Sequence, residues 1–304
     1  MPFSTIRTTW LMLVLVASTA YSCMASATEN LDPYLLGAST GVPAGALPPP
    51  GFYLVNTVYM AHGDKLKNSN GNSVPLKVRN NVNATMLIWV PGWHLLGAEY
   101  AAGVIGLYAE HHVDTTALGG HATRSPGFFN PVIMPLSLSW DLGQGLHTST
   151  SVNVYVPGGN YHYENGKTLQ TSYANNYWTL EPSWAISYLH HGWDFTLNNV
   201  FDINRRNPST DYRSGNSYYL DATVAKTIGR WTVGAIGNYS RQFSDDRQDG
   251  EVVGDGNRFQ HTLVGPMAAY DFGPASLMVR YLQDVRTRND INVSFVLATV
   301  SFRL

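Results

Sequence analysis

The chain of 304 residues carries a formal charge of -2, with 13% charged and 12% aromatic residues. Because this balance leaves no concentrated basic face, it argues against nucleic-acid binding. The mean hydropathy of -0.13 excludes a bundle of membrane-spanning helices, since each such helix needs about 20 consecutive apolar residues.

The N-terminus matches a secretory signal peptide. Arg7 precedes the apolar run 10–20, and Ala25-Ser26-Ala27 supplies the small residues of a cleavage site. We predict removal of residues 1–27 and disfavour a retained anchor, because the apolar run is short for a membrane span. The single cysteine, Cys23, lies inside this segment. The mature chain is therefore expected to contain no disulfide and no Cys-based metal site or nucleophile.

Residues 28–50 form a separate stretch that is rich in Gly, Ala and Pro and ends on Pro48-Pro49-Pro50. Two interpretations stay open for it: a flexible periplasmic lead, or a small plug folded into a lumen. We favour the lead, because proline has no backbone N–H to donate to a strand ladder.

Residues 51–304 alternate between apolar and polar side chains in about twelve stretches. Successive side chains of a strand point to opposite faces, so each stretch predicts a strand with one apolar and one polar face. The linkers are alternately long and very short, which is typical of outer-membrane barrels with short periplasmic turns and longer outer loops. The expected strands span 52–60, 77–89, 95–111, 129–142, 146–156, 177–190, 193–203, 217–228, 231–243, 258–272, 275–287 and 292–304.

The fold class that follows is all-β, a closed antiparallel transmembrane barrel of about twelve strands. Lipid outside and a polar lumen inside satisfy both faces of every strand, and closure leaves no unpaired edge at membrane depth. An even strand count places the N- and C-termini in the periplasm. The alternating Val300–Leu304 resembles the signal that the barrel-assembly machinery recognises during insertion. We therefore expect a bacterial outer-membrane protein in contact with the lipid bilayer and with lipopolysaccharide.

A series of short motifs follows one order along the mature chain. They are Pro49-Pro50-Gly51-Phe52-Tyr53, Asn130-Pro131-Val132-Ile133-Met134-Pro135-Leu136, Asn176-Tyr177-Trp178-Thr179, Thr210–Gly215 and Gly237–Gln242. Together they resemble the family of outer-membrane proteins assigned to transport in the meta-pathway of phenol degradation. Asn130 departs from that family, which more often has Asp before this proline. The resemblance implies uptake of small hydrophobic, often aromatic, molecules and brings no catalytic residues with it.

Charged residues also fall on the polar face of the expected strands. They are Lys77, Arg79, Glu99, Glu181, Asp194, Asp221 and Arg280. A mid-depth Arg or Lys that faced lipid would cost about 2–4 kcal/mol, so we expect these side chains to point into the lumen. Two roles stay open for them: to line a gated path and set its selectivity, or to pair with one another and fill the lumen.

Histidine pairs and an acidic loop are weak candidates for metal sites. His111-His112 and His190-His191 are adjacent residues, whose side chains point to opposite faces of a strand. A tetrahedral site needs three or four converging ligands. The acidic residues between 245 and 255 lack the oxygen spacing of a calcium loop, so we favour a solvated loop there. No metal and no cofactor are expected.

Three functions remain open from the sequence. We favour a passive channel for small hydrophobic or aromatic compounds, and the main alternative is a structural or adhesive barrel with a closed lumen. The third is a phospholipase-like enzyme, since His147-Thr148-Ser149 contains a base and a nucleophile. His147 follows a short periplasmic turn, whereas such enzymes act at the outer leaflet, so we expect no enzymatic activity.

Overall fold

The computed structural model describes residues 29, 31–169 and 172–304. The predicted signal peptide and Cys23 lie outside the described residues. Within the described part of the chain, no helix is long and apolar enough to cross a membrane.

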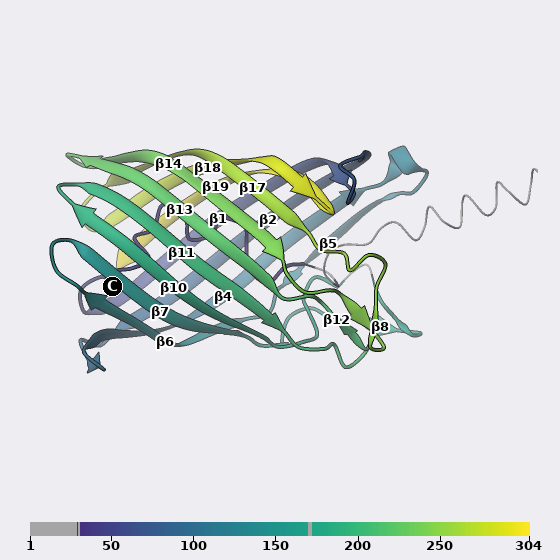
Figure 1. The fold of residues 1–304 in the computed structure, drawn as a ribbon, viewed down its shortest axis with the longest axis horizontal. Helices are drawn as coiled ribbons and strands as arrows, with labels where there is room; N and C mark the ends of the chain where they lie inside the picture. Colours follow the sequence, from purple (N-terminus) through teal and green to yellow (C-terminus); the bar gives the residue numbers. More distant parts are fainter. Residues whose placement is uncertain (1–28, 30, 170–171) are drawn as a thin grey trace, which may run out of the picture.

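Twelve long strands form a closed antiparallel barrel (Figure 1). They are β1 (Gly51–Lys67), β2 (Ser73–Val90), β4 (Ala98–Asp114), β6 (Val132–Asp141), β7 (Leu146–Tyr155), β10 (Thr179–His190), β11 (Trp193–Asn204), β13 (Ser217–Ile228), β14 (Trp231–Gln242), β17 (Gln260–Asp271), β18 (Ala275–Arg288) and β19 (Asp290–Arg303). Each pairs with the next along this series, and β1 pairs with β19 to close the wall. The predicted fold class and strand number are confirmed.

The two ends of the barrel differ, as Figure 1 shows. The turn end carries the short connections, such as the one between β10 and β11, and the loop end carries the long ones. Short elements lie in the connections. They are β3 (His94–Leu95), η2 (Thr116–Leu118), β5 (Ala122–Phe128), β8 (Tyr163–Glu164), β9 (Lys167–Thr168), β12 (Tyr212–Arg213), β15 (Arg247–Gln248) and β16 (Glu251–Val252).

The first hairpin is longer than predicted. Residues 61–75 were expected as an outer loop, but β1 continues to Lys67 and β2 begins at Ser73. The inner face keeps small or apolar residues here, with Ala61 and Gly63 buried, while His62 and Asp64 on the outer face are polar and exposed. The strands therefore extend beyond the apolar belt, where polar side chains face outward without meeting lipid.

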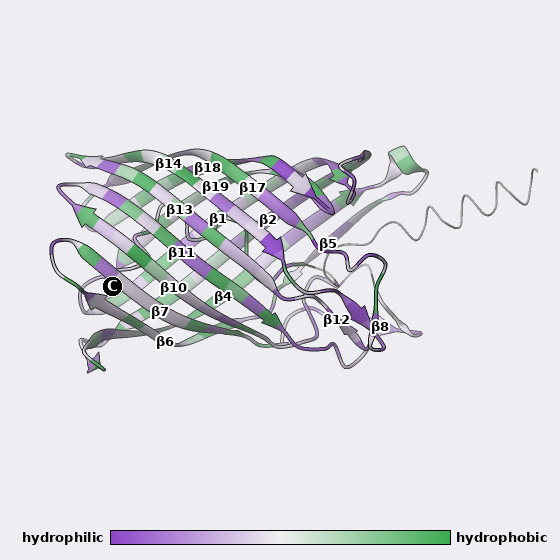
Figure 2. Ribbon diagram, viewed as in Figure 1, coloured by the Kyte–Doolittle hydropathy of each residue, from purple (hydrophilic) through white to green (hydrophobic). Residues whose placement is uncertain are grey.

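The outer surface carries an apolar belt. Figure 2 shows hydrophobic and hydrophilic residues alternating along the strands. Exposed members of the belt include Val58, Leu197, Val224, Val233, Val264 and Val296. Aromatic rings gather at the turn end, where Trp89 contacts the exposed Trp93 and Tyr270 contacts the exposed Phe272. This is the distribution of an outer-membrane barrel, with an aromatic girdle at one interface.

The segment before β1 lies inside the barrel. Its backbone bonds to side chains of the barrel and its loops. The Leu31 carbonyl accepts from Asn175, in the loop before β10, and the Gly45 carbonyl accepts from Ser139 on β6. This geometry is that of a plug and not of the flexible lead that we favoured from the sequence. The segment contributes nothing to a strand ladder, as expected, but polar side chains of the lumen satisfy its backbone groups instead.

The two ends of the described chain lie at opposite ends of the barrel. The Glu29 carboxylate accepts hydrogen bonds from Thr210 Oγ1 at 2.6 Å and Asn207 Nδ2 at 2.8 Å, among the long loops. Leu304 N donates to the Phe52 carbonyl at 2.8 Å, at the turn end. The prediction that both termini lie on the periplasmic side does not hold for these residues. The prediction was based on the number of strands alone. Residues 31–46 also cross the lumen, and this crossing brings Glu29 to the loop end.

Candidate functional site

The lumen has two chemically different walls, with the N-terminal segment between them. The polar wall follows β10, β11, β13 and β18 and contributes the buried side chains Glu181, Asn198, Asp202, Asp221, Thr223 and Arg280. The apolar wall follows β19, β1, β2 and β4 and contributes Tyr59, Ala61, Val78, Val82, Leu107, Phe295 and Leu297. Asp221 and Arg280 of the first wall bond to the segment. On the second wall, Tyr59 Oη donates to the Leu36 carbonyl at 3.4 Å, but gaps remain between the segment and this wall.

Asp221 anchors the segment to the polar wall. Its Oδ2 accepts hydrogen bonds from Tyr34 Oη at 2.6 Å, Ser39 Oγ at 2.7 Å and Ser39 N at 2.9 Å. Its Oδ1 accepts from Asn238 Nδ2 at 2.6 Å. With 2% of its surface exposed, the carboxylate is held by donors from both the segment and the barrel. It is an anchor, and not a free charge along an open path.

Arg280, on β18 of the same wall, holds the same stretch of the segment. Its Nη1 donates to the carbonyls of Ala38 at 2.9 Å and Thr40 at 2.6 Å. Its Nη2 donates to Thr299 Oγ1 at 2.8 Å. Only 1% of this side chain is exposed. The guanidinium therefore replaces water for backbone carbonyls that have no strand or helix partner.

The other residues that were predicted to face the lumen lie at different levels along the barrel axis. Glu181 is buried and accepts from Asn153 Nδ2 at 2.6 Å and Tyr155 Oη at 2.8 Å. Asp194 lies near the turn end, where it accepts from Thr196 Oγ1 at 2.6 Å.

Glu99 also lies at the turn end of the lumen. It pairs in register with Ser139, whose hydroxyl donates to the Gly45 carbonyl at 2.8 Å inside the barrel. Directly paired residues of adjacent strands share a face. The structure thus separates Glu99 and Asp194 from the central anchors Asp221 and Arg280.

The prediction for Lys77 and Arg79 is wrong. Both side chains are exposed on the outer face of β2, while Leu76 and Val78 between and beside them are buried inside. We had assigned polar residues to the lumen because lipid would penalise them. This part of β2 extends above the apolar belt, so the penalty does not apply there.

Two sets of lumen residues were missed. Asp202 alternates with Phe201 and Ile203, so the strand pattern contained the signal for it. Tyr34 and Ser39 lie on a segment without strand or helix periodicity, and nothing in the sequence placed them in the lumen.

Two apolar cavities lie between the segment and the apolar wall. The upper cavity, toward the loop end, has a volume of about 140 Å³ and is lined by residues that include Leu31, Val78, His111, Phe129, Tyr173 and Phe295. The lower cavity has a volume of about 160 Å³ and is lined by residues that include Val55, Ala84, Met86, Ile105, Val132 and Leu297. Both touch Pro33, Tyr34, Leu35, Tyr59 and Leu107. They are therefore neighbours along one wall.

A polar cavity of about 460 Å³ lies above them among the loops. Its lining includes Glu29, Thr168, Ser209, Thr210, Tyr212 and Asp249. Burial raises the pKa of the Glu29 carboxyl above its usual value, although hydrogen bonds from Thr210 and Asn207 oppose this. This cavity forms the mouth of the loop end.

Ser149 and His147 are not arranged as nucleophile and base. Ser149 Oγ donates to the Ala44 carbonyl at 2.7 Å, on the N-terminal segment. His147 Nδ1 instead lies 3.9 Å from a carboxylate oxygen of Asp141. The serine that the sequence singled out thus serves to hold the segment.

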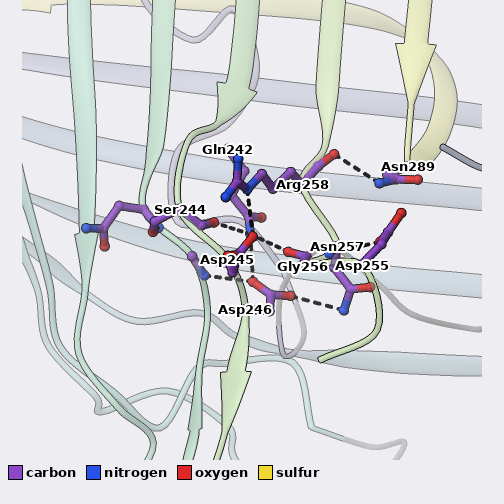
Figure 3. A network of polar contacts seen from close by, with 11 residues as sticks. Gln242, Ser244, Asp245, Asp246, Asp255, Gly256, Asn257, Arg258 and Asn289 are labelled. Atoms are coloured by element: carbon purple, nitrogen blue, oxygen red, sulfur yellow. Dashed lines mark hydrogen bonds and ion pairs between the residues drawn. The ribbon is translucent and has the colours of Figure 1, made fainter. Parts of the chain in front are cut away.

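Within the described part of the chain, no three His, Cys, Asp or Glu side chains are placed to hold a metal ion. The acidic loop is instead organised around Asp246, as Figure 3 shows. This carboxylate is fully buried and accepts from Tyr212 Oη at 2.5 Å, Gly215 N at 2.7 Å, Gln242 Nε2 at 2.8 Å and Asn257 Nδ2 at 3.3 Å. The expectation of a solvated loop therefore fails for Asp246, which ties together two outer loops.

Lower pH should stabilise the folded loop that the hydrogen bonds of Asp246 hold together. Burial raises the pKa of Asp246 to about 6, against about 3.9 for an unfolded Asp. The folded loop then binds the proton more tightly, so its stability falls as the pH rises from about 4 to about 6 and is level above. We expect protease cleavage of the loop, normalised to an unfolded substrate, to be slower at pH 5 than at pH 7.

Asp246→Asn should remove this pH dependence. Asp245→Asn is the matched control, because Asp245 pairs with Arg258 at 2.7 Å and not with the groups around Asp246. This substitution should leave the pH dependence of cleavage in place. Equal cleavage of the unaltered protein at the two pH values would contradict the role of Asp246.

The barrel aligns with solved bacterial outer-membrane proteins. The COG4313 outer membrane channel from Pseudomonas putida F1 aligns with a TM-score of 0.74 and 16% identity, over 90% of this chain and 100% of that one. The translocator domain of the autotransporter NalP from Neisseria meningitidis aligns with a TM-score of 0.51 and 9% identity, over 84% of this chain and 90% of that one. At these identities the likeness establishes the fold alone.

Sequence comparison supplies the family. No curated protein matches this chain. A family model covers residues 63–304, which include eleven of the twelve barrel strands in full and the upper end of β1. The chain belongs to the family described as "Putative MetA-pathway of phenol degradation".

Proposed function

We propose that this protein is an outer-membrane channel through which small hydrophobic compounds, aromatic ones among them, enter passively. The observation that carries the proposal is the pair of adjacent apolar cavities along one wall of the lumen. The name of the family, which refers to phenol degradation, and the fold of the P. putida channel support it.

The size and lining of the cavities fit one-ring compounds. An apolar cavity of about 150 Å³ in a protein interior stays dry and binds benzene, and the two cavities here measure about 140 and 160 Å³. Transfer of an apolar ligand from water into such a space is favourable by about 25 cal/mol per Å² of buried apolar surface. Sugars and ions have no comparable gain, because the N-terminal segment occupies the polar wall.

In this proposal the loop end faces the exterior and the turn end faces the periplasm, with the C-terminus on the periplasmic side. The loops then meet lipopolysaccharide, and the barrel-assembly machinery inserts the chain. Compounds enter at the polar mouth near Glu29 and Tyr212, then move past Tyr59 and Leu107 from the upper to the lower cavity.

A tryptophan in the lower cavity should block uptake. Ala84 lines that cavity, so Ala84→Trp would fill it, while Ala298→Trp places the same side chain on the outer face of β19, opposite Val58. We expect cells that carry Ala84→Trp to take up radiolabelled toluene no faster than cells without the gene. Cells that carry Ala298→Trp should match the unaltered protein.

Two outcomes would count against the proposal. Equal toluene uptake by the Ala84→Trp and unaltered proteins would remove the cavities from the path. Equal uptake with and without the gene would favour the alternative, a structural or adhesive barrel with a closed lumen. The segment that fills the polar half of the lumen is the observation in favour of that alternative.

A further inference from the structure

Most of the wall of the upper cavity is apolar, and its polar side chains are Asn80, His111, Asp32, His261 and Asp290. His261 Nε2 lies 3.2 Å from Asp290 Oδ2, in an ion pair. Asn80 and His111 belong to one row of the barrel wall. Ala61, Asn80 and His111 are paired in register across β1, β2 and β4. The next row toward the turn end is Tyr59, Val82 and Ala109, which are all buried and apolar. Asn80 and His111 both line the cavity.

The two polar side chains of this row differ in their hydrogen bonding. Asn80 Oδ1 accepts a hydrogen bond from Tyr173 Oη at 3.1 Å. His111 Nδ1 is buried and has no hydrogen-bond partner among the described residues. A buried polar atom without a partner costs free energy, and such atoms are uncommon in native proteins. A polar group of a ligand in the cavity would supply that partner.

We propose that His111 makes the upper cavity selective for one-ring compounds that carry a hydroxyl group, over ring hydrocarbons of the same size. The proposal rests on the channel function and names the ligand class within it. The cavity of about 140 Å³ limits the ligand to about one ring. Neutral imidazole offers one acceptor and one donor nitrogen, and a ring hydroxyl pairs with either. A hydrocarbon leaves the buried Nδ1 atom of His111 without a hydrogen-bond partner.

His112 provides a matched control. It is adjacent in the chain but pairs with Arg79, whose side chain is exposed on the outer face, so it lies on the opposite side of β4. His111→Leu and His112→Leu make the same chemical change on the two faces of one strand. His111→Gln keeps a hydrogen-bonding group in the cavity.

The test is equilibrium dialysis of radiolabelled phenol and toluene against each refolded protein at one detergent concentration. Partition into detergent is then common to all proteins and cancels when the toluene-to-phenol ratio of dissociation constants is compared between them. Loss of one hydrogen bond should lower this ratio about tenfold in His111→Leu. His112→Leu should keep the ratio of the unaltered protein, and His111→Gln should recover part of it. Heat-dependent gel mobility verifies that each barrel is folded.

Two results separate this inference from the channel function. If the unaltered protein binds both compounds and folded His111→Leu keeps the same ratio as His112→Leu, His111 does not select the ligand and this inference alone fails. If the unaltered protein binds neither phenol nor toluene, the proposed function fails together with it.

Discussion

Replacing Arg280 with methionine should release the N-terminal segment and open the lumen to ions. Methionine cannot donate to the Ala38 and Thr40 carbonyls, and it leaves the buried carboxylate of Asp221 without its cationic neighbour. Removing one partner of a buried charged network costs about 3–5 kcal/mol. A loss of this size should be enough to detach a short segment that is held by a few hydrogen bonds. We expect a higher single-channel conductance in planar bilayers, and faster cleavage within residues 31–46 by an added protease.

Arg241→Met is the control for this experiment. Arg241 is exposed at the loop end of β14, so its loss should leave both the conductance and the cleavage unchanged. If Arg280→Met kept the conductance and the protease protection of the unaltered protein, the anchor at Arg280 would not hold the segment.

Gly265→Ala should destabilise the barrel more than other glycine substitutions in its wall. A Cβ atom at Gly265 would lie 1.8 Å from the Tyr281 carbonyl oxygen, on the adjacent strand β18. The strands would have to separate at a place where their pairing is already interrupted, between Val264 and Met267. Overpacking of this kind costs about 1–3 kcal/mol, and a clash with backbone belongs at the upper end. Urea unfolding in detergent, followed by tryptophan fluorescence, measures the change.

Gly106→Ala is the matched control on the opposite wall. Gly106 is also within a strand, but a Cβ atom there meets no atom within 4 Å. We expect its unfolding midpoint to stay at that of the unaltered protein. Equal midpoints for Gly265→Ala and Gly106→Ala would show that the β17–β18 pair tolerates a side chain at this position.

The barrel could be predicted because its environment acts on every strand in the same way. Lipid outside and polar groups inside impose a period of two, which is plain in Trp193–Asn204. The same rule failed above the apolar belt, where the outer face of the strand is polar and the inner face is small or apolar. For this reason the extension of β1 to Lys67 was missed, and Lys77 and Arg79 were assigned to the wrong face.

The site could be predicted only in part. Alternation placed Asp221 and Arg280 in the lumen, and the structure finds both there. Their hydrogen-bond partners belong to residues 31–46, which show no strand or helix periodicity. Side chains of distant strands, and not a regular ladder, bond to the backbone groups of this segment. Long-range pairing of this kind leaves no local pattern in a sequence.

The cavities depend on the same arrangement. Their inner boundary is formed by Pro33, Tyr34 and Leu35 of the segment, and their outer boundary by Tyr59 and Leu107 of the wall. Neither boundary predicts a cavity by itself. The space exists because the segment bonds to the polar wall and leaves its apolar side chains facing the other one.

Crystals of the protein soaked in bromobenzene test the apolar path most directly. The anomalous signal of bromine locates the compound without assumptions about transport. We predict bromine peaks in the upper cavity, the lower cavity or both, within van der Waals distance of Tyr59 or Leu107. Peaks confined to the outer apolar belt or to the polar mouth, with both cavities empty at saturating bromobenzene, would contradict the account.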